Sequence, residues 1–306
     1  WKVILSRSGQ TTRGYDRTRV RQIQHAEEED NGLAEVLLEN SDLALNAINF
    51  EQYQGIIYYG YHTGVTCSAW AANTAYSVGA VVIPTTANGY QYRCTVAGTS
   101  HATTEPTWGT ALGVTQTDGT VTWEMDGNSG DEYESRAPLK VEGQEFISSE
   151  TQLICRLYLL GLPNQMSEEK AESQYTQTSS DTQTCKTLIT AIAGATLAPY
   201  TNYPAVTVTY DSEDSLLNSF VPADYFSVEV NDDRERKIRE LMANTGSKRR
   251  IEDDGAIHVL DPTTTGTTYD YEYQLAVSTE HTFLAKALRE RFINPNKEVV
   301  CSNPKT

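Results

Sequence analysis

The sequence contains few cysteines and no long apolar run, and both features exclude classes of protein. No stretch is apolar over the length that a membrane-spanning helix needs, so a membrane span is not expected. The cysteines have no C-x-x-C spacing, which favours reduced, mostly buried thiols over a disulfide framework. A Cys67–Cys94 disulfide is the alternative if their segments meet. The five cysteines are Cys67, Cys94, Cys155, Cys185 and Cys301.

Basic residues are scarce relative to acidic ones. There are 24 Lys and Arg against 41 Asp and Glu, which gives a net charge of −17. Because phosphate binding needs clustered Lys and Arg, this balance argues against nucleic acid as the main partner and against sequence-specific nucleic acid binding. A local basic run precedes the acidic residues 27–30, and alternating charges of this kind are typical of a solvated strand pair. The run consists of Arg13, Arg17, Arg19 and Arg21.

Recognisable catalytic motifs are missing as well. The sequence has no H-E-x-x-H, G-x-S-x-G or P-loop pattern, and its five histidines are scattered without metal-ligand spacing. His258 lies in the apolar stretch 256–260, where packing is expected rather than catalysis. The acids at 27–30 and 253–254 could be imagined as a glycosidase pair. Adjacent acids in turns, however, usually serve only to keep the turn solvated. We predict no catalytic, metal-binding or cofactor-binding residue, and a protein that is not an enzyme.

What is abundant is β-forming sequence. The chain of 306 residues has 18 tyrosines, many threonines and short turns rich in Gly, Asn or Asp, which together favour a β-rich protein with a few helices. The length allows two or three domains, or one domain that carries an insertion. The chain starts at Trp1 rather than Met and stops at Thr306 without a terminating element, so further sequence on either side stays open.

The segment 212–262 has the clearest local pattern. Residues 225–230 alternate bulky and polar side chains, as in a strand with one buried face. Asn231 is the expected N-cap of a helix that follows, and Gly246 lies past its end. Asp254-Gly255 between two β-forming stretches predicts a hairpin. The helix's apolar stripe consists of Ile238, Leu241 and Met242.

The other elements are predicted from period and turn residues. Residues 182–193 have a helical apolar face that ends at Gly194. Residues 163–180 are polar and predicted as a loop or partly helical. The remaining predicted strands are 1–6, 19–25, 32–40, 54–61, 138–148, 151–160, 206–210, 248–252, 256–260, 269–277 and 298–301, with one more helix at 280–292.

Composition changes abruptly at residues 66–127. This segment has one basic residue, Arg93, against four acidic ones, and it holds three of the chain's four tryptophans. We interpret it as a compact all-β module of about 60 residues, the low end for autonomous folding. It is inserted in a loop of the surrounding domain, where insertions cost little when the ends are close. Its predicted strands are 81–83, 89–96 and 120–124, with a turn at Asp118-Gly119.

Four phrases outside this module carry a resemblance. They are GLAEVLLENSDLALNAINFEQYQGIIYYGY at 32–61, PLKVEGQEFISSETQLICRLYLLGL at 138–162, DSLLNSFVPADYFSVEVNDDRERKIRELMANTGSKRRIEDDGAIHVLDP at 214–262 and INPNKEVVCS at 293–302. In this order they resemble the hub proteins of phage tails and related injection machines, the late-control-D or baseplate-hub family. The resemblance covers most of residues 1–65 and 130–306.

The resemblance implies a fold and a domain organisation. The fold is β-rich α+β, with two tail-tube-like antiparallel β-barrel domains, a few short helices and the small all-β inserted module. Residues 1–65 and 128–162 are expected to form the first, discontinuous hub barrel. Residues 163–306 are expected to form the second hub region, and its continuation beyond the end of the chain stays open.

The resemblance also implies a function and partners. Members of this family form ring-shaped homotrimers that join the hexameric tail tube to a threefold tail tip, as structural virion proteins of the tail tip or baseplate assembled in the host cytoplasm. The expected partners are the chain itself, a tail-tube or distal tail protein, and a tip, spike or fibre protein. DNA passes through the lumen, and an acidic lumen wall repels the DNA and so reduces its adsorption.

The module at 66–127 departs from the hub pattern and carries a second resemblance. Its W-x5-Y-x2-G-x-V spacing, followed by YQYRCTVAGTS, PTW and DGTVTWE, looks like the small carbohydrate-binding-like modules of phage structural proteins and chitinases. Exposed aromatic faces stack on sugar rings, so this likeness implies contact with host surface glycans. The alternative, favoured by the module's small size, is that the aromatics form its core. The candidate glycan-binding residues are Trp108, Trp70, Tyr76 and Tyr90.

Two rival functions remain open. One is a carbohydrate-binding adhesion protein whose β scaffold only displays residues 66–127. The other is a hydrolase component that acts on cell-wall material.

Overall fold

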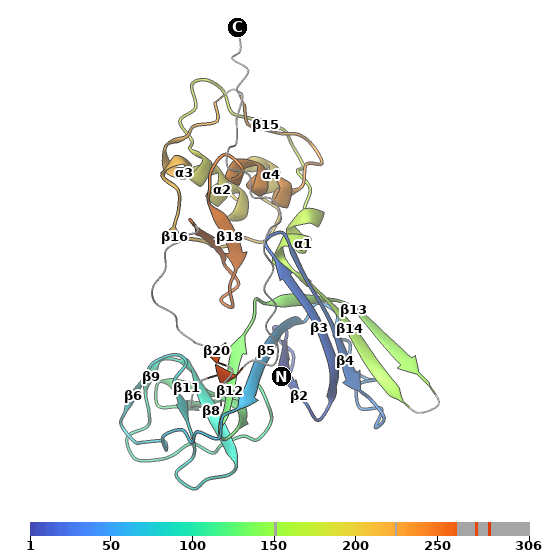
Figure 1. The fold of residues 1–306 in the computed structure, drawn as a ribbon, viewed down its shortest axis with the longest axis vertical. Coiled ribbons are helices and arrows are strands. Elements are labelled where there is room, and N and C mark those ends of the chain that lie inside the picture. The colour runs from blue at the N-terminus through green and yellow to red at the C-terminus, as the bar shows by residue number, and fades with distance from the viewer. Residues whose placement is uncertain (150–151, 224, 262–272, 275–280, 283–306) are drawn as a thin grey trace. The chain divides into compact units, whose positions relative to one another are not determined.

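The computed structural model describes residues 1–149, 152–223, 225–261, 273–274 and 281–282. The chain divides into two compact units, Trp1–Pro262 and Thr263–Thr306. In the described part of the first unit, mostly antiparallel strands are combined with four short α-helices (Figure 1). This confirms the predicted β-rich α+β fold with a few short helices.

One large sheet joins the start of the chain to residues beyond the module. Its order is β2-β1-β5-β13-β14-β4-β3, with β12 paired to β5, and every ladder is antiparallel. Among the described residues no ladder joins β2 to β3, so closure into a barrel is not seen here. The strands are β1 (Lys2–Ser6), β2 (Arg13–Asp16), β3 (Val20–Glu28), β4 (Asn31–Glu39), β5 (Gln54–His62), β12 (Asp131–Ser135), β13 (Leu139–Ser148) and β14 (Leu153–Gly161).

The alternation of side chains along these strands produces the core of the sheet. In β4, Gly32, Ala34, Val36 and Leu38 are buried and the residues between them are not, the period-two pattern of a strand with one covered face. Burying a side chain such as Leu38 contributes about 1.5–3 kcal/mol. The core consists of Val3, Leu5, Val20, Ala34, Val36, Leu38, Leu45, Phe50, Tyr53, Ile57, Leu139, Val141, Cys155, Leu157 and Leu159.

Residues 66–127 build their own sheet around a separate aromatic core. Four antiparallel strands follow the order β10-β11-β8-β7, and β6 pairs with β9. The turn at Asp118-Gly119 forms as predicted, with Gly119 at φ +61°. The strands are β6 (Ala75–Tyr76), β7 (Val81–Val82), β8 (Tyr90–Val96), β9 (Gly98–Thr99), β10 (Thr115–Asp118) and β11 (Val121–Asn128).

Residues 162–261 combine helices with a three-stranded sheet. In this sheet β19 pairs in parallel with β16 and antiparallel with β18. The core on one side of it combines Leu188 and Ile189 from α2, Ile238 from α4, and Ile257 from β19. The elements are α1 (Leu162–Glu168), β15 (Tyr175–Thr176), α2 (Cys185–Ala193), the 3-10 helix η1 (Ala198–Tyr200), β16 (Val208–Ser212), α3 (Ser215–Ser219), β17 (Ser227–Val228), α4 (Arg234–Met242), β18 (Lys248–Ile251) and β19 (Ile257–Leu260).

The predicted strand, helix and hairpin of this region are present, with one wrong cap. Asp233, not Asn231, caps α4, because its Oδ1 accepts the N–H of Arg236 at 2.6 Å. Asn231 instead adopts a left-handed conformation, with φ +72°. Asp254 and Gly255 turn the chain between β18 and β19, and Gly255 has φ +78°.

Three further differences concern the bounds or the presence of elements. The polar segment 163–180 begins with a helix, α1, whose second residue is Pro163, a position that favours proline. Strand β12 was not predicted. It forms because residues 131–135 pair with residues 58–62, the second half of β5. The strand expected at 225–230 is limited to β17.

Most predictions for the second unit lie outside the described residues. They are the strands 269–277 and 298–301 and the helix 280–292. Within these ranges the structure describes β20 (Tyr273–Gln274) paired in parallel with β21 (His281–Thr282), so residues 281–282 are strand and not helix.

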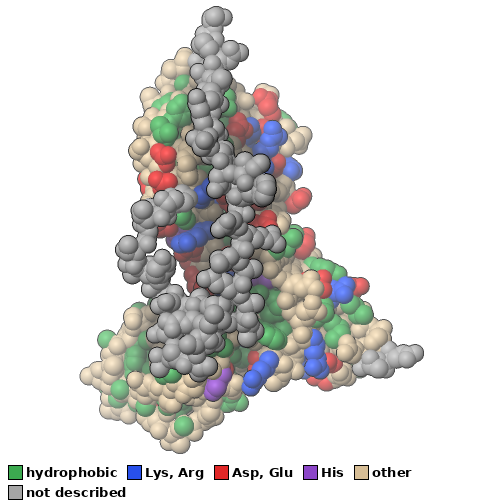
Figure 2. Space-filling model, viewed as in Figure 1, with side chains coloured by type: hydrophobic (Ala, Val, Ile, Leu, Met, Phe, Trp, Pro, Cys, Tyr) green, Lys and Arg blue, Asp and Glu red, His purple; other side chains and the backbone are tan. Residues whose placement is uncertain are grey.

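The described cysteines are free thiols, and charged side chains are unevenly distributed over the surface. Cys67, Cys94, Cys155 and Cys185 are free, so Cys67 and Cys94 do not form the alternative disulfide. None of the helices in the described ranges is both long and apolar enough to cross a membrane. Figure 2 shows few charged side chains over β6 and β9, whereas acidic and basic side chains lie intermixed around α1 and α4.

Candidate functional site

The aromatic side chains of the module form one connected cluster. Trp123 of β11 is fully buried, and the rings of Tyr76 and Trp108 meet it edge-on at centroid distances of 4.8 and 6.0 Å. Trp108 also packs on Tyr92 at 4.3 Å. Large rings supply much of the apolar area that a segment of this size can bury.

Asp118 fixes two of the three tryptophans. Its Oδ2 accepts the indole N–H of Trp70 at 2.7 Å and that of Trp123 at 3.0 Å, and its Oδ1 accepts the backbone N–H of His101 at 2.8 Å. Asp118 is itself buried, so these are charge-assisted bonds in a desolvated site. Trp70 is only 7 % exposed, which favours core packing over sugar stacking for this ring.

The other three candidate residues, Trp108, Tyr76 and Tyr90, are half-buried against the same core. Trp108 donates its indole N–H to Glu105 Oε1 at 2.8 Å, and the hydroxyl of Tyr76 accepts the N–H of Ala71 at 2.9 Å. The structure therefore brings Trp108 and Tyr76 together around Trp123, and both residues stay partly exposed.

A buried ion pair, which the sequence did not predict, joins the module to the large sheet. Lys2 Nζ in β1 lies 2.7 Å from Asp126 Oδ1 in β11, and the two side chains are 0 % and 2 % exposed. Arg93 Nε is 3.1 Å from the same oxygen. The ammonium group also lies over the rings of Tyr58 and Tyr133, at 4.5 and 4.3 Å from their centroids.

The electrostatics of this junction favour the charged pair. Burial alone would raise the pKa of Asp126, but the charges of Lys2 and Arg93 outweigh it and hold the pKa below its ordinary value. Burial lowers the pKa of Lys2, and Asp126 opposes that shift. The only sequence signal was a lysine inside the apolar run 1–5.

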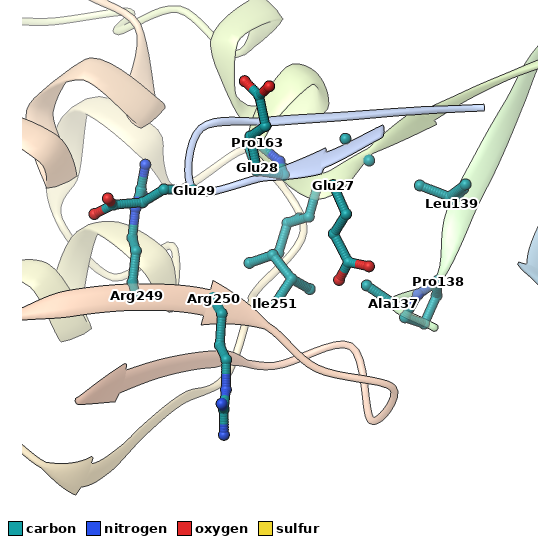
Figure 3. A pocket seen from close by; sticks show the side chains of 13 residues that line it. Glu27, Glu28, Glu29, Ala137, Pro138, Leu139, Pro163, Arg249, Arg250 and Ile251 are labelled. Atoms are coloured by element: carbon teal, nitrogen blue, oxygen red, sulfur yellow. The ribbon is translucent and has the colours of Figure 1, made fainter. Parts of the chain in front are cut away.

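A cavity of about 250 Å³ lies where the turn after β3 approaches β18. Figure 3 shows Glu27–Glu29 on one side, residues 249–251 on the other and residues 137–139 at the end, with Arg249 and Arg250 leaving the strand in opposite directions. Arg249 Nη1 already binds Glu235 Oε2 at 3.0 Å, and Arg250 Nε binds Glu252 Oε1 at 2.6 Å. The described lining residues include no Ser, Thr, Cys or His, so this cavity offers binding rather than nucleophilic chemistry.

The acids at 27–30 were considered as a glycosidase pair, and two of them form ion pairs instead. Glu29 Oε2 lies 3.5 Å from Lys248 Nζ, and Asp30 Oδ2 lies 2.7 Å from Arg239 Nη1. All four side chains are largely exposed, as expected for solvated charges.

One group of side chains in the described residues could hold a metal ion: Asp211, Glu252 and His258. His258 is buried, as predicted, with 8 % exposure, but it faces carboxylates rather than an apolar core. Glu252 and Asp254 are near it in sequence, but its nearest partner Asp211 is 47 residues away, so local pattern alone could not complete the cluster.

Comparison with known proteins gives structural matches alone. No protein-family model matches the chain, and no curated protein matches it. The chain is similar to the structure of a tail protein from Neisseria meningitidis MC58, with a TM-score of 0.43, 8 % identity and coverage of 84 % of this chain and 50 % of that one. It is also similar to a 43 kDa tail protein of prophage MuSo2 from Shewanella oneidensis, with a TM-score of 0.35, 9 % identity and coverage of 85 % and 54 %. The chain thus spans about half the length of each of these proteins.

Proposed function

We propose that this chain is a structural, non-enzymatic component of a phage tail, the hub that joins the tail tube to the tail tip. The observation that carries the proposal is the ordered set of hub-like phrases in the sequence. The phrase at 32–61 folds into β4, a turn region and β5, the phrase at 138–162 into the hairpin β13–β14, and the phrase at 214–262 into α3, β17, α4 and the hairpin β18–β19. The fourth phrase, at 293–302, lies outside the described residues.

The proposal includes a domain organisation. Residues 1–65 and 128–162 form the first hub domain, residues 66–127 the inserted module and residues 163–306 the second hub region. Three separate apolar cores, one in each of these ranges, support the division. The hub assembles as a homotrimer, contacts a tail-tube or distal tail protein above and a tip, spike or fibre protein below, and lets DNA pass through an acidic lumen.

Labelling of intact particles tests the assignment. An antibody against residues 66–127, detected with gold in electron micrographs, should mark the tail tip, either directly or after the particles are disrupted. Size-exclusion chromatography with light scattering should give three times the 33.9 kDa chain mass. Absence of label in both states, with an antibody shown to bind the folded chain, would count against the hub, and a strictly monomeric chain at high concentration would count against the trimer.

A second element of the proposal is that the module contacts host surface glycans. The partial exposure of Trp108, Tyr76 and Tyr90 supports it, because an aromatic side chain that is not fully covered can stack on a sugar. Trp70, at 7 % exposure, is left out of this part of the proposal.

A glycan array with the whole chain tests this role. Trp108→Ala and Tyr90→Ala should abolish binding in chains that circular dichroism shows to be folded, whereas loss of folding in Trp108→Ala would instead favour its role in the core. Trp1→Ala is the matched control, because Trp1 is 50 % exposed and lies outside the module. If the folded wild-type chain binds no glycan, the module is a structural piece, and the hub assignment stands or falls on the labelling alone.

A further inference from the structure

His258 lies on the face of the three-stranded sheet that turns away from the helices. Its neighbours Ile257 and Val259 are buried in the core shared with α2 and α4, and side chains alternate along a strand. The imidazole therefore points to the opposite face, where it is nevertheless only 8 % exposed. Its cross-strand partners there are Arg250 in β18 and Thr209 in β16, so its surroundings are polar.

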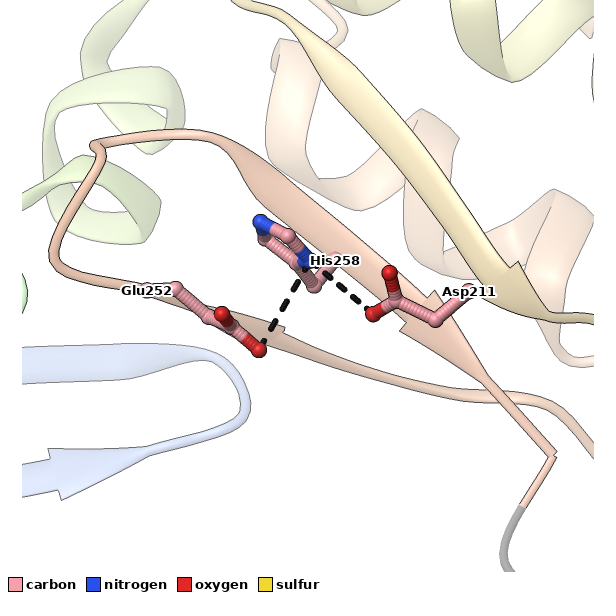
Figure 4. Close-up of side chains that lie close together, drawn as sticks. All are labelled: Asp211, Glu252 and His258. Atoms are coloured by element: carbon pink, nitrogen blue, oxygen red, sulfur yellow. Dashed lines mark hydrogen bonds and ion pairs between the residues drawn. The ribbon is translucent and has the colours of Figure 1, made fainter. Parts of the chain in front are cut away.

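Three carboxylates surround this ring. Nδ1 of His258 lies 2.9 Å from Asp211 Oδ2 and 3.6 Å from Glu252 Oε1, and Nε2 lies 3.2 Å from Asp254 Oδ2. Figure 4 shows Asp211 and Glu252 reaching Nδ1 from either side. Nδ1 and one oxygen of each of these two acids all lie within 4.8 Å of one another.

If the imidazole is neutral, hydrogen bonds from the ring alone cannot satisfy the carboxylates on both of its nitrogens. A neutral imidazole has one N–H, and when Nε2 donates it to Asp254, the lone pair of Nδ1 faces two carboxylates that are acceptors only. Arg250, with Nε 2.6 Å from Glu252 Oε1, supplies one positive charge against three negative ones. Either a second proton on the ring or a cation beside Nδ1 is needed.

Without a cation, the second proton fills this role. Burial by itself lowers the pKa of His258, but hydrogen bonds to Asp211 and Asp254 outweigh burial and raise the pKa above its ordinary value. The same carboxylates that hold the proton are also suited to hold a metal ion.

We propose that Nδ1 of His258, Asp211 and Glu252 form a site for a divalent transition-metal ion such as Mn²⁺ or Zn²⁺. One imidazole nitrogen with two carboxylate oxygens suits these ions better than Ca²⁺ or Mg²⁺, which take oxygen ligands. Metal–ligand bonds of about 2.0–2.2 Å place neighbouring ligand atoms about 3–3.5 Å apart, near the 2.9 and 3.6 Å found here. Asp254 holds the ring from Nε2, as outer partners of metal-bound histidines do.

The ion ties together the three strands of this sheet. Asp211 belongs to β16, His258 to β19, and Glu252 directly follows β18. The β16–β19 ladder is parallel, a pairing slightly weaker per residue than an antiparallel one. Binding therefore raises the stability of this region. The metal affinity decreases as the pH is lowered, because the proton then competes with the metal for Nδ1.

Mn²⁺ binding to the whole, chelator-treated chain tests the site, with the free ion measured by electron paramagnetic resonance. Mn²⁺ is chosen because it favours oxygen and nitrogen over the chain's free thiols. We expect saturable 1:1 binding that weakens by about 10-fold or more in Asp211→Asn and Glu252→Gln. Their side chains are 40 % and 30 % exposed, so these near-isosteric variants are expected to fold.

The matched control is His62→Ala. His62 Nδ1 also contacts a carboxylate, Asp131 Oδ1 at 2.9 Å, but this one acid makes no metal cluster, so the variant should bind Mn²⁺ like wild type. A rise in Tm with Mn²⁺ or Zn²⁺ should occur in wild type and His62→Ala and be clearly smaller at the same ion concentration in Asp211→Asn and Glu252→Gln. The site is wrong if the folded wild type binds neither ion saturably, or if both variants, shown to be folded by circular dichroism, bind as wild type does.

Discussion

Lys2 and Asp126 form a fully buried ion pair, 2.7 Å between Nζ and Oδ1, that connects strand β1 of the large sheet to strand β11 of the module. Removing two charges from water costs several kcal/mol each, and only their mutual attraction and further hydrogen bonds offset this. Gln91 Nε2 supplies one such bond to Asp126 Oδ2, at 2.9 Å. Removing either partner would therefore leave the other charge buried without its closest counter-ion.

Replacing one partner of this pair should be strongly destabilising. We expect Lys2→Met to lower the free energy of unfolding by about 3–5 kcal/mol, because Asp126 loses its closest cation while staying buried. Urea unfolding followed by circular dichroism measures this. Arg236→Met is the control, since the Arg236 side chain is 61 % exposed and its partner Asp232 keeps Lys237 as a second cation at 3.1 Å, so the loss should be about 0.5 kcal/mol or less.

The double variant Lys2→Met with Asp126→Leu separates charge burial from packing. Its loss of stability should be smaller than the sum of the two single losses, because neither Lys2 nor Asp126 is left as a buried charge without the other. Equal losses for Lys2→Met and Arg236→Met would contradict a buried role for the pair.

Asp118 holds two indole rings with one oxygen, and its charge should matter to the module's core. In Asp118→Asn we expect a loss of about 2–3 kcal/mol, because charge-assisted bonds to Trp70 and Trp123 become neutral or are lost. Thermal unfolding followed by tryptophan fluorescence measures the change. Glu105→Gln is the control, because Glu105 accepts one indole N–H, that of the half-buried Trp108. The loss of stability in this variant should be clearly smaller. Similar melting curves for both variants would show that Asp118 is not a core acceptor.

Much of the fold could be predicted from local sequence, and the wrong cap shows the limit. Period-two and helical patterns, with turn residues such as Asp254-Gly255, are local and indicated the hairpin β18–β19 and helix α4. The cap of α4 was placed at Asn231, because Asn and Asp are both good N-caps. The choice of Asp233 depends on where the chain turns, and Asn231 takes the left-handed conformation that Asn tolerates.

The candidate sites could be predicted only where the residues themselves indicate chemistry. Aromatic enrichment indicated the cluster around Trp123, although exposed and buried rings look alike in sequence. The bonds of Lys2 to Asp126 and of His258 to Asp211 span 124 and 47 residues. Such partners are brought together by strand register and by the packing of separate sheets, which no sequence period reports.

A side chain at Gly14 of β2 would clash sterically with the module. A Cβ there would come 2.3 Å from Leu112 Cβ and 2.6 Å from Leu112 O, so backbone would have to move. We expect Gly14→Ala to cost about 1–3 kcal/mol and to weaken hydrogen-exchange protection in β11. Gly246→Ala is the control, because the nearest atom to its Cβ would be 3.7 Å away. No difference between the two variants would contradict close packing of Leu112 on β2.

Acid sensitivity should reside partly in Glu213, which lies between β16 and α3. The hydrogen bond from Lys186 in α2, 2.5 Å between Nζ and Oε1, is the main cause that lowers the pKa of Glu213 to about 2, and Asn218 adds to it. The folded-state pKa is below the unfolded value of 4.5, so the pair's contribution is fully present above pH 4.5 and is lost as pH falls toward 2.

The pair is partly exposed, so its contribution is expected to be about 1 kcal/mol or less. The stability difference between wild type and Glu213→Gln, from urea unfolding at a series of pH values, should therefore be constant near neutral pH and shrink between about pH 4.5 and 2. Glu134→Gln is the control, because Glu134 meets Arg136 at 3.5 Å with 69 % of its side chain exposed, and its difference should be near zero throughout. A Glu213→Gln difference that does not change across this acid range would contradict a coupling between Glu213 and Lys186.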